Sequence, residues 1–234
     1  MAKCAGKQSF IAKQSSPSGY NGMPLTEPSR PMIPHYWHTL PGPQWFSATR
    51  IYAEQVKRAD HGAVFVELGC WKGRSTAFMG VEIANSGKCI DFYAVDHWRG
   101  SLEESAHEED EDVRRGRLYE TFQTNIRPIE NYIRPLRLDS AEAAANFEDL
   151  SVDFVYMDAG HTTAAVARDI AAWWPKLKAE GTLAGDDWCY INERCNDLSV
   201  RRAVLEFFVP RGIAILVQPG DPNPEWEQWL VSKA

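Results

Sequence analysis

A carboxylate and two glycines follow the first strongly apolar run of the chain, in the order Glu67, Gly69 and Gly73. The run itself, residues 63–68, predicts a buried strand, and the residues after Gly73 are compatible with a helix. A strand that turns into a helix through glycines is typical of a backbone that passes close to a small ligand. The chemistry of this turn therefore depends on which ligand fits it.

The residues between and after the glycines argue against two common ligands. Dinucleotide-binding turns have the pattern G-x-G-x-x-G, in which the second glycine lets the backbone approach the pyrophosphate. Here Trp71 holds that second position and Arg74 holds the third. The phosphate-binding pattern G-x-x-x-x-G-K-[ST] also fails, because the glycines are too close and Lys72 precedes the second one. The turn better suits a ligand that has a ribose and no phosphates.

The later candidate strands also end in acids. Because ligands of parallel sheets bind outside the carboxyl ends of the strands, we expect these acids to converge on one edge. A single acid after a strand is commonly a turn or helix-capping residue, so capping could explain one or two of them. The residues in question are Asp96 with His97 and Trp98, Asp139 with Ser140, Asp158 with His161, and the pair Asp186 and Asp187.

A ribose-containing ligand gives several of these residues a role. Asp96 would accept the ribose hydroxyls, as the acid does in dinucleotide folds, and Glu67 would help to hold a cationic amino group. This arrangement resembles the S-adenosylmethionine (SAM) site of class I methyltransferases, which hold adenine at the positions of Asp139 and Ser140. The cofactor-binding residues that we predict are Glu67, Gly69, Gly73, Ser75, Asp96, His97, Trp98, Asp139, Ser140 and Asp158.

Asp158 and the pair Asp186 and Asp187 form a second constellation. Their strands should be neighbours about 4.8 Å apart, and Gly185 makes it easy for the chain to bend so that both aspartates of the pair approach Asp158. Three carboxylates at one point repel each other unless a cation lies among them. Oxygen ligands favour Mg²⁺, or Mn²⁺ or Ca²⁺, over zinc. In the alternative, Asp186 is a turn residue and Asp187 a solvated or capping acid.

The segments around these acids closely resemble one group of class I methyltransferases. The group contains the macrocin-type and related sugar O-methyltransferases of antibiotic pathways, and similar enzymes that act on glycans. The resemblance covers about residues 62–190 and is carried by segments 95–100, 152–161, 169–177 and 181–188. It implies a Rossmann-like class I fold with a seven-stranded sheet, and a divalent metal held by Asp158, Asp186 and Asp187.

The reaction that we expect is the attack of a sugar hydroxyl on the sulfonium methyl group of SAM. Metal coordination would lower the pKa of this hydroxyl, and Asp158 or His161 would take its proton. A following helix N-terminus would keep His161 neutral and able to accept that proton; alternatively, His161 only orients Asp158 or caps the helix. A catechol-like small-molecule acceptor, or a non-catalytic SAM-binding protein, are the other functions that stay open.

Strands and helices alternate along the chain in the order that would position these residues. This alternation predicts a mostly parallel sheet with helices on both faces, and the last two segments predict an antiparallel hairpin at one edge. Residues 1–44 are rich in Pro, Ser and Gly and predict a partly ordered arm before a methyltransferase domain at 45–234. The expected strands are 63–68, 90–95, 133–138, 152–157, 182–185, 213–218 and 226–231, and the expected helices 45–57, 74–85, 113–126, 141–147, 163–178 and 200–208.

Composition limits the partners and the cellular setting. The 234 residues, 44% of them hydrophobic, allow one sizeable core. A net charge of -7 disfavours unspecific binding to nucleic acid or anionic membranes. No apolar run is long enough to span a bilayer, the start has no apolar signal core, and the five cysteines form no CxxC pair. We therefore expect a cytoplasmic protein that binds a small-molecule or glycan acceptor, with homo-oligomerisation open.

Overall fold

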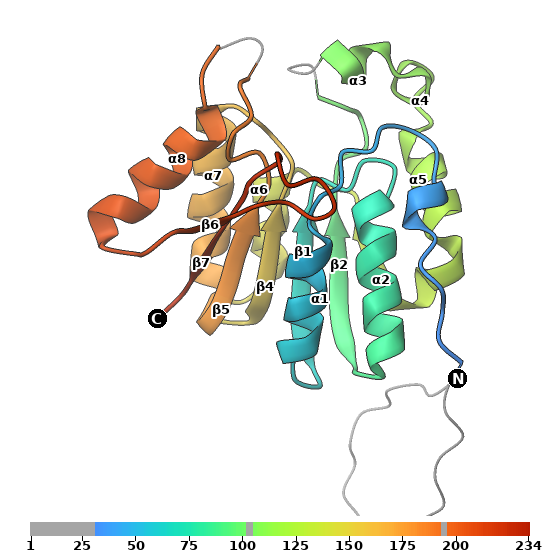
Figure 1. Ribbon diagram of the computed structural model, residues 1–234, viewed down its shortest axis with the longest axis horizontal. Helices are drawn as coiled ribbons and strands as arrows, with labels where there is room; N and C mark the ends of the chain where they lie inside the picture. The colour runs from blue at the N-terminus through green and yellow to red at the C-terminus, as the bar shows by residue number, and fades with distance from the viewer. Residues whose placement is uncertain (1–30, 102–104, 193–195) are drawn as a thin grey trace, which may run out of the picture.

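The computed structural model describes residues 31–101, 105–192 and 196–234, and a seven-stranded sheet lies at its centre (Figure 1). The strand order is β3-β2-β1-β4-β5-β7-β6. Three strands have the bounds that the sequence predicts to the residue: β1 (Ala63–Leu68), β2 (Ile90–Val95) and β4 (Val152–Met157). The others are β3 (Ile133–Leu136), β5 (Leu177–Gly185), β6 (Leu216–Gln218) and β7 (Gln228–Ser232).

The order of the strands reverses direction between β1 and β4. From β1 the chain moves outward through β2 to β3, and then returns to place β4 and β5 on the other side of β1. The pairs from β3 to β5 are parallel, whereas β7 pairs antiparallel with both β5 and β6. This confirms the predicted parallel sheet with an antiparallel C-terminal hairpin. In such sheets the ligand crevice lies at the reversal, outside the carboxyl ends of the strands.

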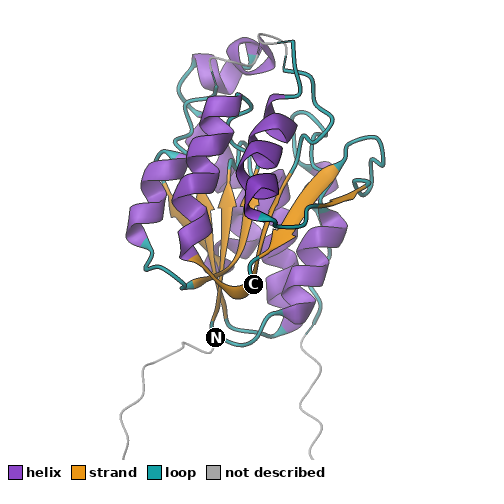
Figure 2. Cartoon of the chain, turned by 90° about the vertical axis from the view of Figure 1, so that its left-hand side faces the viewer, coloured by secondary structure: helices purple, strands orange, loops and turns teal. Residues whose placement is uncertain are grey.

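Helices cover both faces of the sheet (Figure 2). One face packs against α1 (Thr49–Arg58), α2 (Arg74–Ser86) and α5 (Leu118–Ile126), where alternate strand residues such as Phe65 and Phe154 form the core. The opposite face packs against α6 (Ser140–Ala143), α7 (Thr163–Trp173) and α8 (Ser199–Phe208). Because both faces are buried, the central strands are nearly continuous apolar runs, which is why the sequence revealed their bounds.

Four predicted helices are shorter than expected. The helix expected at 45–57 begins only at Thr49, and the one expected at 141–147 is α6 followed by a 3-10 turn, Ala144–Asn146. The other two have a clear local cause. The helix expected at 113–126 is divided into α4 (Glu111–Arg114) and α5 by Gly116, whose φ is +64°. The helix expected at 163–178 ends as α7 at Trp173 and continues only as a short 3-10 turn, because Pro175 has no amide hydrogen to donate. The last residues of that prediction belong instead to β5, which is longer than expected.

Residues 31–44 lie along α2 and α5 (Figure 1). Asn85 donates to and accepts from the backbone of Ile33, and the buried guanidinium of Arg74 donates to the carbonyls of Trp37, Leu40 and Gly42. This part of the predicted arm is therefore fixed to the domain. The rest of the arm, residues 1–30, lies outside the described residues.

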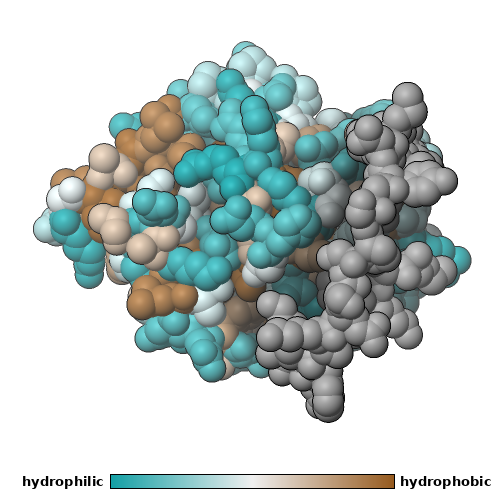
Figure 3. Space-filling view, turned by 90° about the horizontal axis from the view of Figure 1, so that it is seen from below, coloured by the Kyte–Doolittle hydropathy of each residue, from teal (hydrophilic) through white to brown (hydrophobic). Residues whose placement is uncertain are grey.

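The two ends of the sheet differ in what they carry. At the carboxyl ends of the strands lie α3 (Ser105–Glu109), α4 and the loops that follow β1, β2, β4 and β5 (Figure 1). Where Figure 3 shows described residues at the opposite end, hydrophilic surface alternates with apolar patches, which gather toward the α8 side. None of the helices in the described ranges is both long enough and apolar enough to cross a bilayer.

Candidate functional site

The turn after β1 meets the end of β4 at the reversal of the sheet. Gly69 has a φ of +85°, and a Cβ atom there would lie 1.9 Å from the backbone oxygen of Asp158. The amide of Asp158 donates to the carbonyl of Leu68 at 2.8 Å. Only glycine can occupy this position, since any side chain would separate the two strand ends. The glycine turn and Asp158 are therefore brought to one point, as predicted.

Gly73 also lets α5 approach the glycine turn. It has a φ of +82°, and a Cβ atom there would lie 2.9 Å from the ring of Phe122 on α5. The missing side chain thus makes room for α5, and the predicted part of Gly73 in cofactor binding stays a prediction. The indole of Trp71 instead stacks on His107 of α3, with ring centroids 4.1 Å apart.

The carboxylate of Asp96 holds the glycine turn in place. Its Oδ2 accepts hydrogen bonds from the amides of Cys70 and Trp71, at 2.9 and 3.0 Å, and its Oδ1 accepts one from the amide of Trp98 at 2.6 Å. The predicted proximity of Asp96 to the glycine turn is confirmed. A carboxylate offers about four acceptor positions, and these bonds use three of them among the described residues.

The two residues after Asp96 have local structural roles. Nδ1 of His97 accepts from the amide of Arg99 at 3.0 Å. Trp98 is only 2% exposed, and its ring packs against Tyr119 and Phe122 with centroids 4.7 and 4.6 Å away. Packing thus accounts for the indole of Trp98, and its predicted part in cofactor binding stays a prediction.

Glu67 is a buried acid beneath the turn, 1% exposed. Tyr52 Oη donates to its Oε1 at 2.8 Å and Thr76 Oγ1 to its Oε2 at 2.5 Å. Burial raises the pKa of Glu67 from 4.5 to about 7, although hydrogen bonds from Ser75, Thr76 and Tyr52 lower it; the charge of Asp158 adds to the rise. A cation placed beside Glu67 would therefore find a carboxyl group close to ionisation at neutral pH.

The side chains of Asp139 and Ser140 are turned toward the neighbouring helices. Asp139 caps α6 by accepting from the amides of Ala141 and Glu142, and it pairs with Arg168 at 2.9 Å. Ser140 Oγ donates to both oxygens of Asp169 at 2.7 and 2.8 Å. The structure thus places both residues at the expected edge of the sheet, and it fixes them there through α7.

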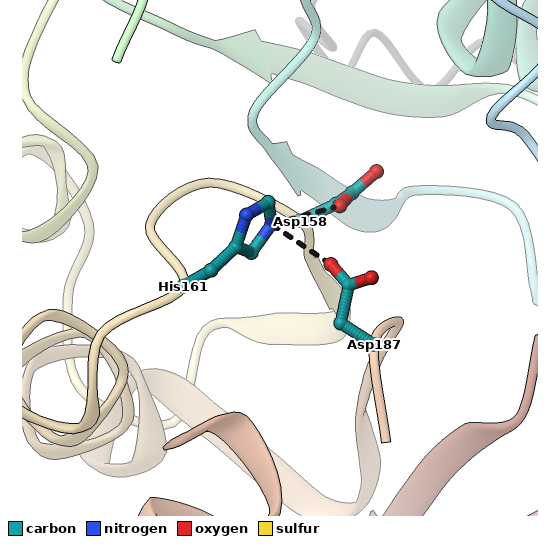
Figure 4. A group of neighbouring side chains, drawn as sticks. All are labelled: Asp158, His161 and Asp187. Carbon is teal, nitrogen blue, oxygen red and sulfur yellow. Dashed lines mark ion pairs between the residues drawn. The ribbon is translucent and has the colours of Figure 1, made fainter. Parts of the chain in front are cut away.

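Asp158, His161 and Asp187 form the compact acidic group of the site (Figure 4). One potential ligand atom from each residue lies within 4.8 Å of the others. His161 Nε2 lies 2.8 Å from Asp187 Oδ2 and 3.6 Å from Asp158 Oδ1, and all three side chains are partly exposed. These residues come from the loops after β4 and β5, so the predicted meeting of Asp158 and Asp187 occurs.

The carboxylate of Asp186 was expected to lie with those of Asp158 and Asp187, but it points elsewhere. Its Oδ2 accepts from Ser47 Oγ at 3.3 Å and its Oδ1 from the amide of Asp187 at 3.0 Å, in a buried position. Burial and the charges of Asp187 and Asp158 raise its pKa well above the usual value. Among the described residues, Asp186 is outside the group of three, because successive residues at a strand end point to opposite sides.

The bend that separates the two aspartates lies two residues after Gly185, the residue at which the sequence suggested it. Asp187 itself has a φ of +64°. Gly185 instead leaves space for Trp229 of β7, since a Cβ atom there would lie 2.7 Å from the indole. The sequence thus located the bend to within two residues but assigned it to the wrong one.

Sequence reasoning missed Lys72 as an anchor of the site. Its Nζ lies 2.7 Å from Asp110 Oδ2 and 3.0 Å from Asp112 Oδ2, and these side chains are largely buried. The pairs hold α4 over the glycine turn, beside the stack of Trp71 on His107. The acidic run from 108 to 112 was a visible signal, but its partner lies 38 residues earlier in the chain.

The chain matches a known protein family in sequence and resembles solved structures in fold. Residues 66–188 match the family described as "Methyltransferase domain". The O-methyltransferase NovP has a similar structure, with a TM-score of 0.56 and 16% identity over 80% of this chain and 78% of that one. Fibrillarin of Aeropyrum pernix, solved with natively bound S-adenosyl-L-methionine, has a TM-score of 0.50 and 17% identity over 79% of this chain and 76% of that one.

Two further matches complete the comparison. A SAM-dependent O-methyltransferase of Thermotoga maritima has a TM-score of 0.51 and 14% identity, over 80% of this chain and 64% of that one. An uncharacterized protein of Sinorhizobium fredii, y4gI, is 25% identical over 216 residues, which are 88% of this chain. They are 22% of that protein, so the chain spans about a fifth of its length. The structural likenesses confirm the predicted Rossmann-like fold.

Proposed function

Since the chain belongs to the methyltransferase-domain family, within the class I enzymes that use SAM, we propose that it methylates a hydroxyl group of a sugar or glycan with the help of a divalent cation. The observation that carries this proposal is the group of Asp158, His161 and Asp187, which adjoins the Gly69 turn at the carboxyl edge of the sheet. Two similar structures bear the name O-methyltransferase, which supports oxygen as the accepting atom.

The acidic group fits a divalent cation in its chemistry and spacing. Asp158 and Asp187 would be the carboxylate ligands, since their oxygens and His161 Nε2 lie within 4.8 Å of one another. With a neutral imidazole, two negative charges face each other at this point, and their repulsion favours a bound cation. The same charges help to raise the pKa of the buried Asp186 beside them. A divalent cation bound there would lower the pKa of an acceptor hydroxyl and fix its direction.

The SAM-binding residues would surround the same edge. Glu67 would pair with the amino group of the methionine part, Asp96 would accept from the ribose, and the segment 139–140 would contact adenine. SAM itself supplies the electrophilic methyl group. Hydrogen bonds to Asp96 already fix the backbone of the Gly69 turn. Ordering this turn should therefore cost little conformational entropy when the cofactor binds.

His161 is the residue that we propose to take the proton of the attacking hydroxyl. Its Nε2 faces the two aspartates, and the next residue, Thr162, is the N-cap of α7. The helix N-terminus disfavours a charged imidazole, whereas the nearby carboxylates favour it. An imidazole is a side chain whose ordinary base strength suits general base catalysis near neutral pH. Asp158 is the alternative proton acceptor.

A sugar and a catechol-like acceptor could both stack on aromatic side chains near the glycine turn. Trp45, 40% exposed, lies with its ring 5.9 Å from Trp71 and 5.6 Å from His107. Such rings stack on the apolar face of a sugar, which supports the glycan acceptor that the resemblance implies. They would equally stack on a phenol, and a catechol-like acceptor is therefore the second candidate.

Methyl transfer by matched variants tests the proposal. Asp158→Asn and Asp187→Asn should abolish transfer from SAM to sugars with vicinal hydroxyls in Mg²⁺, while calorimetry still detects binding of S-adenosylhomocysteine. The control Asp149→Asn removes an exposed acid that pairs with Lys176 away from the site, and it should behave as wild type. Full activity of the wild type in EDTA would exclude the metal mechanism. Transfer to catechol and to no sugar would select the second candidate.

A further inference from the structure

Three side chains of α7 that the proposed chemistry does not use hold the loop after β3 in place. Asp169 accepts two hydrogen bonds from Ser140 Oγ, at 2.7 and 2.8 Å. One turn later, Trp173 Nε1 donates to the carbonyl oxygen of Ser140 at 2.8 Å. Arg168 pairs with Asp139 at 2.9 Å. Both the hydroxyl and the carbonyl of Ser140 are thus fixed by one helix.

Asp169 is an unusual residue for this position if packing were its only task. It is 2% exposed, among apolar side chains of α7 such as Val166, Ile170 and Trp173. Burial raises its pKa to about 6, against the lowering effects of Ser140 and Arg168, and the charge of Asp139 adds to the rise. Burying a carboxylate is unfavourable compared with burying an apolar side chain, unless hydrogen bonds compensate for it. An apolar residue at this position could not accept the two hydrogen bonds from Ser140, so these bonds are what the acid contributes.

The same helix connects two regions of the site. Its N-cap, Thr162, follows His161 of the acidic group, and Asp169 lies about 9 Å further along the axis from Thr163. A helix is rigid over this length. The loop at 139–140 is therefore fixed relative to the group of Asp158, His161 and Asp187 by a single element.

We propose that Asp169 is a positioning residue for the cofactor, which holds the segment 139–140 in the conformation that adenine binding requires. This inference rests on the proposed function, because it takes SAM to bind at this edge of the sheet. Asp169 acts through Ser140 and not by contact with the reacting atoms. Its loss should therefore weaken cofactor binding and leave the cation site unchanged.

Calorimetry on the full-length chain tests this, with S-adenosylhomocysteine and Mn²⁺ as separate probes. Asp169→Leu and Ser140→Ala should each weaken S-adenosylhomocysteine binding about tenfold, the effect of one lost hydrogen bond to a charged group. Because both variants break the same contact, the double variant should bind no more weakly than Asp169→Leu alone. Asp169→Asn, which keeps an acceptor oxygen for Ser140, should restore most of the affinity. In all of them the Mn²⁺ affinity should stay within about twofold of wild type.

The control is Asp153→Asn, at the amino end of β4, where the acid accepts from the amide of Val64 and pairs with Lys178. It should leave both affinities unchanged. An equal loss of S-adenosylhomocysteine and Mn²⁺ binding in the Asp169 and Ser140 variants would overturn the inference, because it would show a general structural role. Unchanged S-adenosylhomocysteine affinity would overturn it as well. A wild type that binds no S-adenosylhomocysteine would instead overturn the proposed function itself.

Discussion

Glu67 is predicted to make the stability of the protein depend on pH in a way that Glu67→Gln removes. The structure raises the pKa of this buried carboxyl group from 4.5 to about 7, chiefly through burial. A raised pKa in the folded state means that the folded protein binds the proton more tightly than the unfolded chain does. The stability linked to Glu67 is therefore fully present below pH 4.5 and is lost as the pH rises through 7.

The size of the effect follows from the shift. A difference of about 2.5 pKa units corresponds to about 3 kcal/mol, at 1.36 kcal/mol for each unit. Glutamine keeps the size of the side chain and hydrogen-bond partners for Tyr52 and Thr76, but it cannot ionise. Between pH 5 and pH 8.5 the wild type should therefore lose about 2.5 kcal/mol of unfolding free energy relative to Glu67→Gln, since part of the total is already lost below pH 5.

Urea unfolding of both proteins at four or more pH values in this range measures that difference. Effects of the other titrating groups are common to the two proteins and largely cancel. A difference that stays constant within about 0.5 kcal/mol across the range would refute the reasoning, because it would show that Glu67 is ionised in the folded protein throughout.

The same group predicts proton release on cofactor binding. If the amino group of the cofactor pairs with Glu67, the carboxyl group must ionise when the ligand binds at pH 6, where most of it is protonated in the free protein. Calorimetry of S-adenosylhomocysteine binding in two buffers of different ionisation enthalpy should therefore detect the release of up to about one proton for the wild type. Glu67→Gln should release none. Equal proton release by both proteins would show that Glu67 does not hold the amino group.

Two further variants test how the site is assembled. Gly69→Ala should lose several kcal/mol of stability and all S-adenosylhomocysteine binding, since its Cβ would lie 1.9 Å from the backbone oxygen of Asp158. The control Gly62→Ala has a φ of +87° but nothing within 4 Å of the new Cβ. It should therefore lose only about 1 kcal/mol of stability. Similar urea midpoints for the two would contradict the close-approach argument. Lys72→Met should increase hydrogen exchange in residues 105–114, because it removes two ion pairs to α4. Lys176→Met, which removes one surface pair, should not, and unchanged exchange in both would show that Lys72 does not hold α4.

The fold was predictable wherever burial alone sets the pattern. Strands β1, β2 and β4 lie between two helical layers, so their apolar runs begin and end with the strand. The helical boundaries at Gly116 and Pro175 were missed, although both residues are local signals. The apolar periodicity continued across both residues, and the predicted helices were extended along it although Gly and Pro commonly end helices.

The sequence predicted where on the sheet the site lies, but not the contacts that each side chain makes. Parallel strands end at one edge, so the approach of Asp158 to Asp187 and of Asp96 to the glycine turn followed from the strand order. The direction of each side chain depends on partners far away in the sequence. Asp186 turns to Ser47, 139 residues earlier, and Ser140 turns to Asp169, 29 residues later. Such pairs leave no trace in local spacing.

The central claim is that Asp158 and Asp187 hold a divalent cation beside the bound cofactor. Crystals of the complex with S-adenosylhomocysteine and Mn²⁺ test it most directly, through anomalous scattering at the manganese edge. We predict one strong peak within coordination distance of both carboxylates, with the adenosine ribose at Asp96. Density for S-adenosylhomocysteine at that place without a manganese peak between the two aspartates would contradict it.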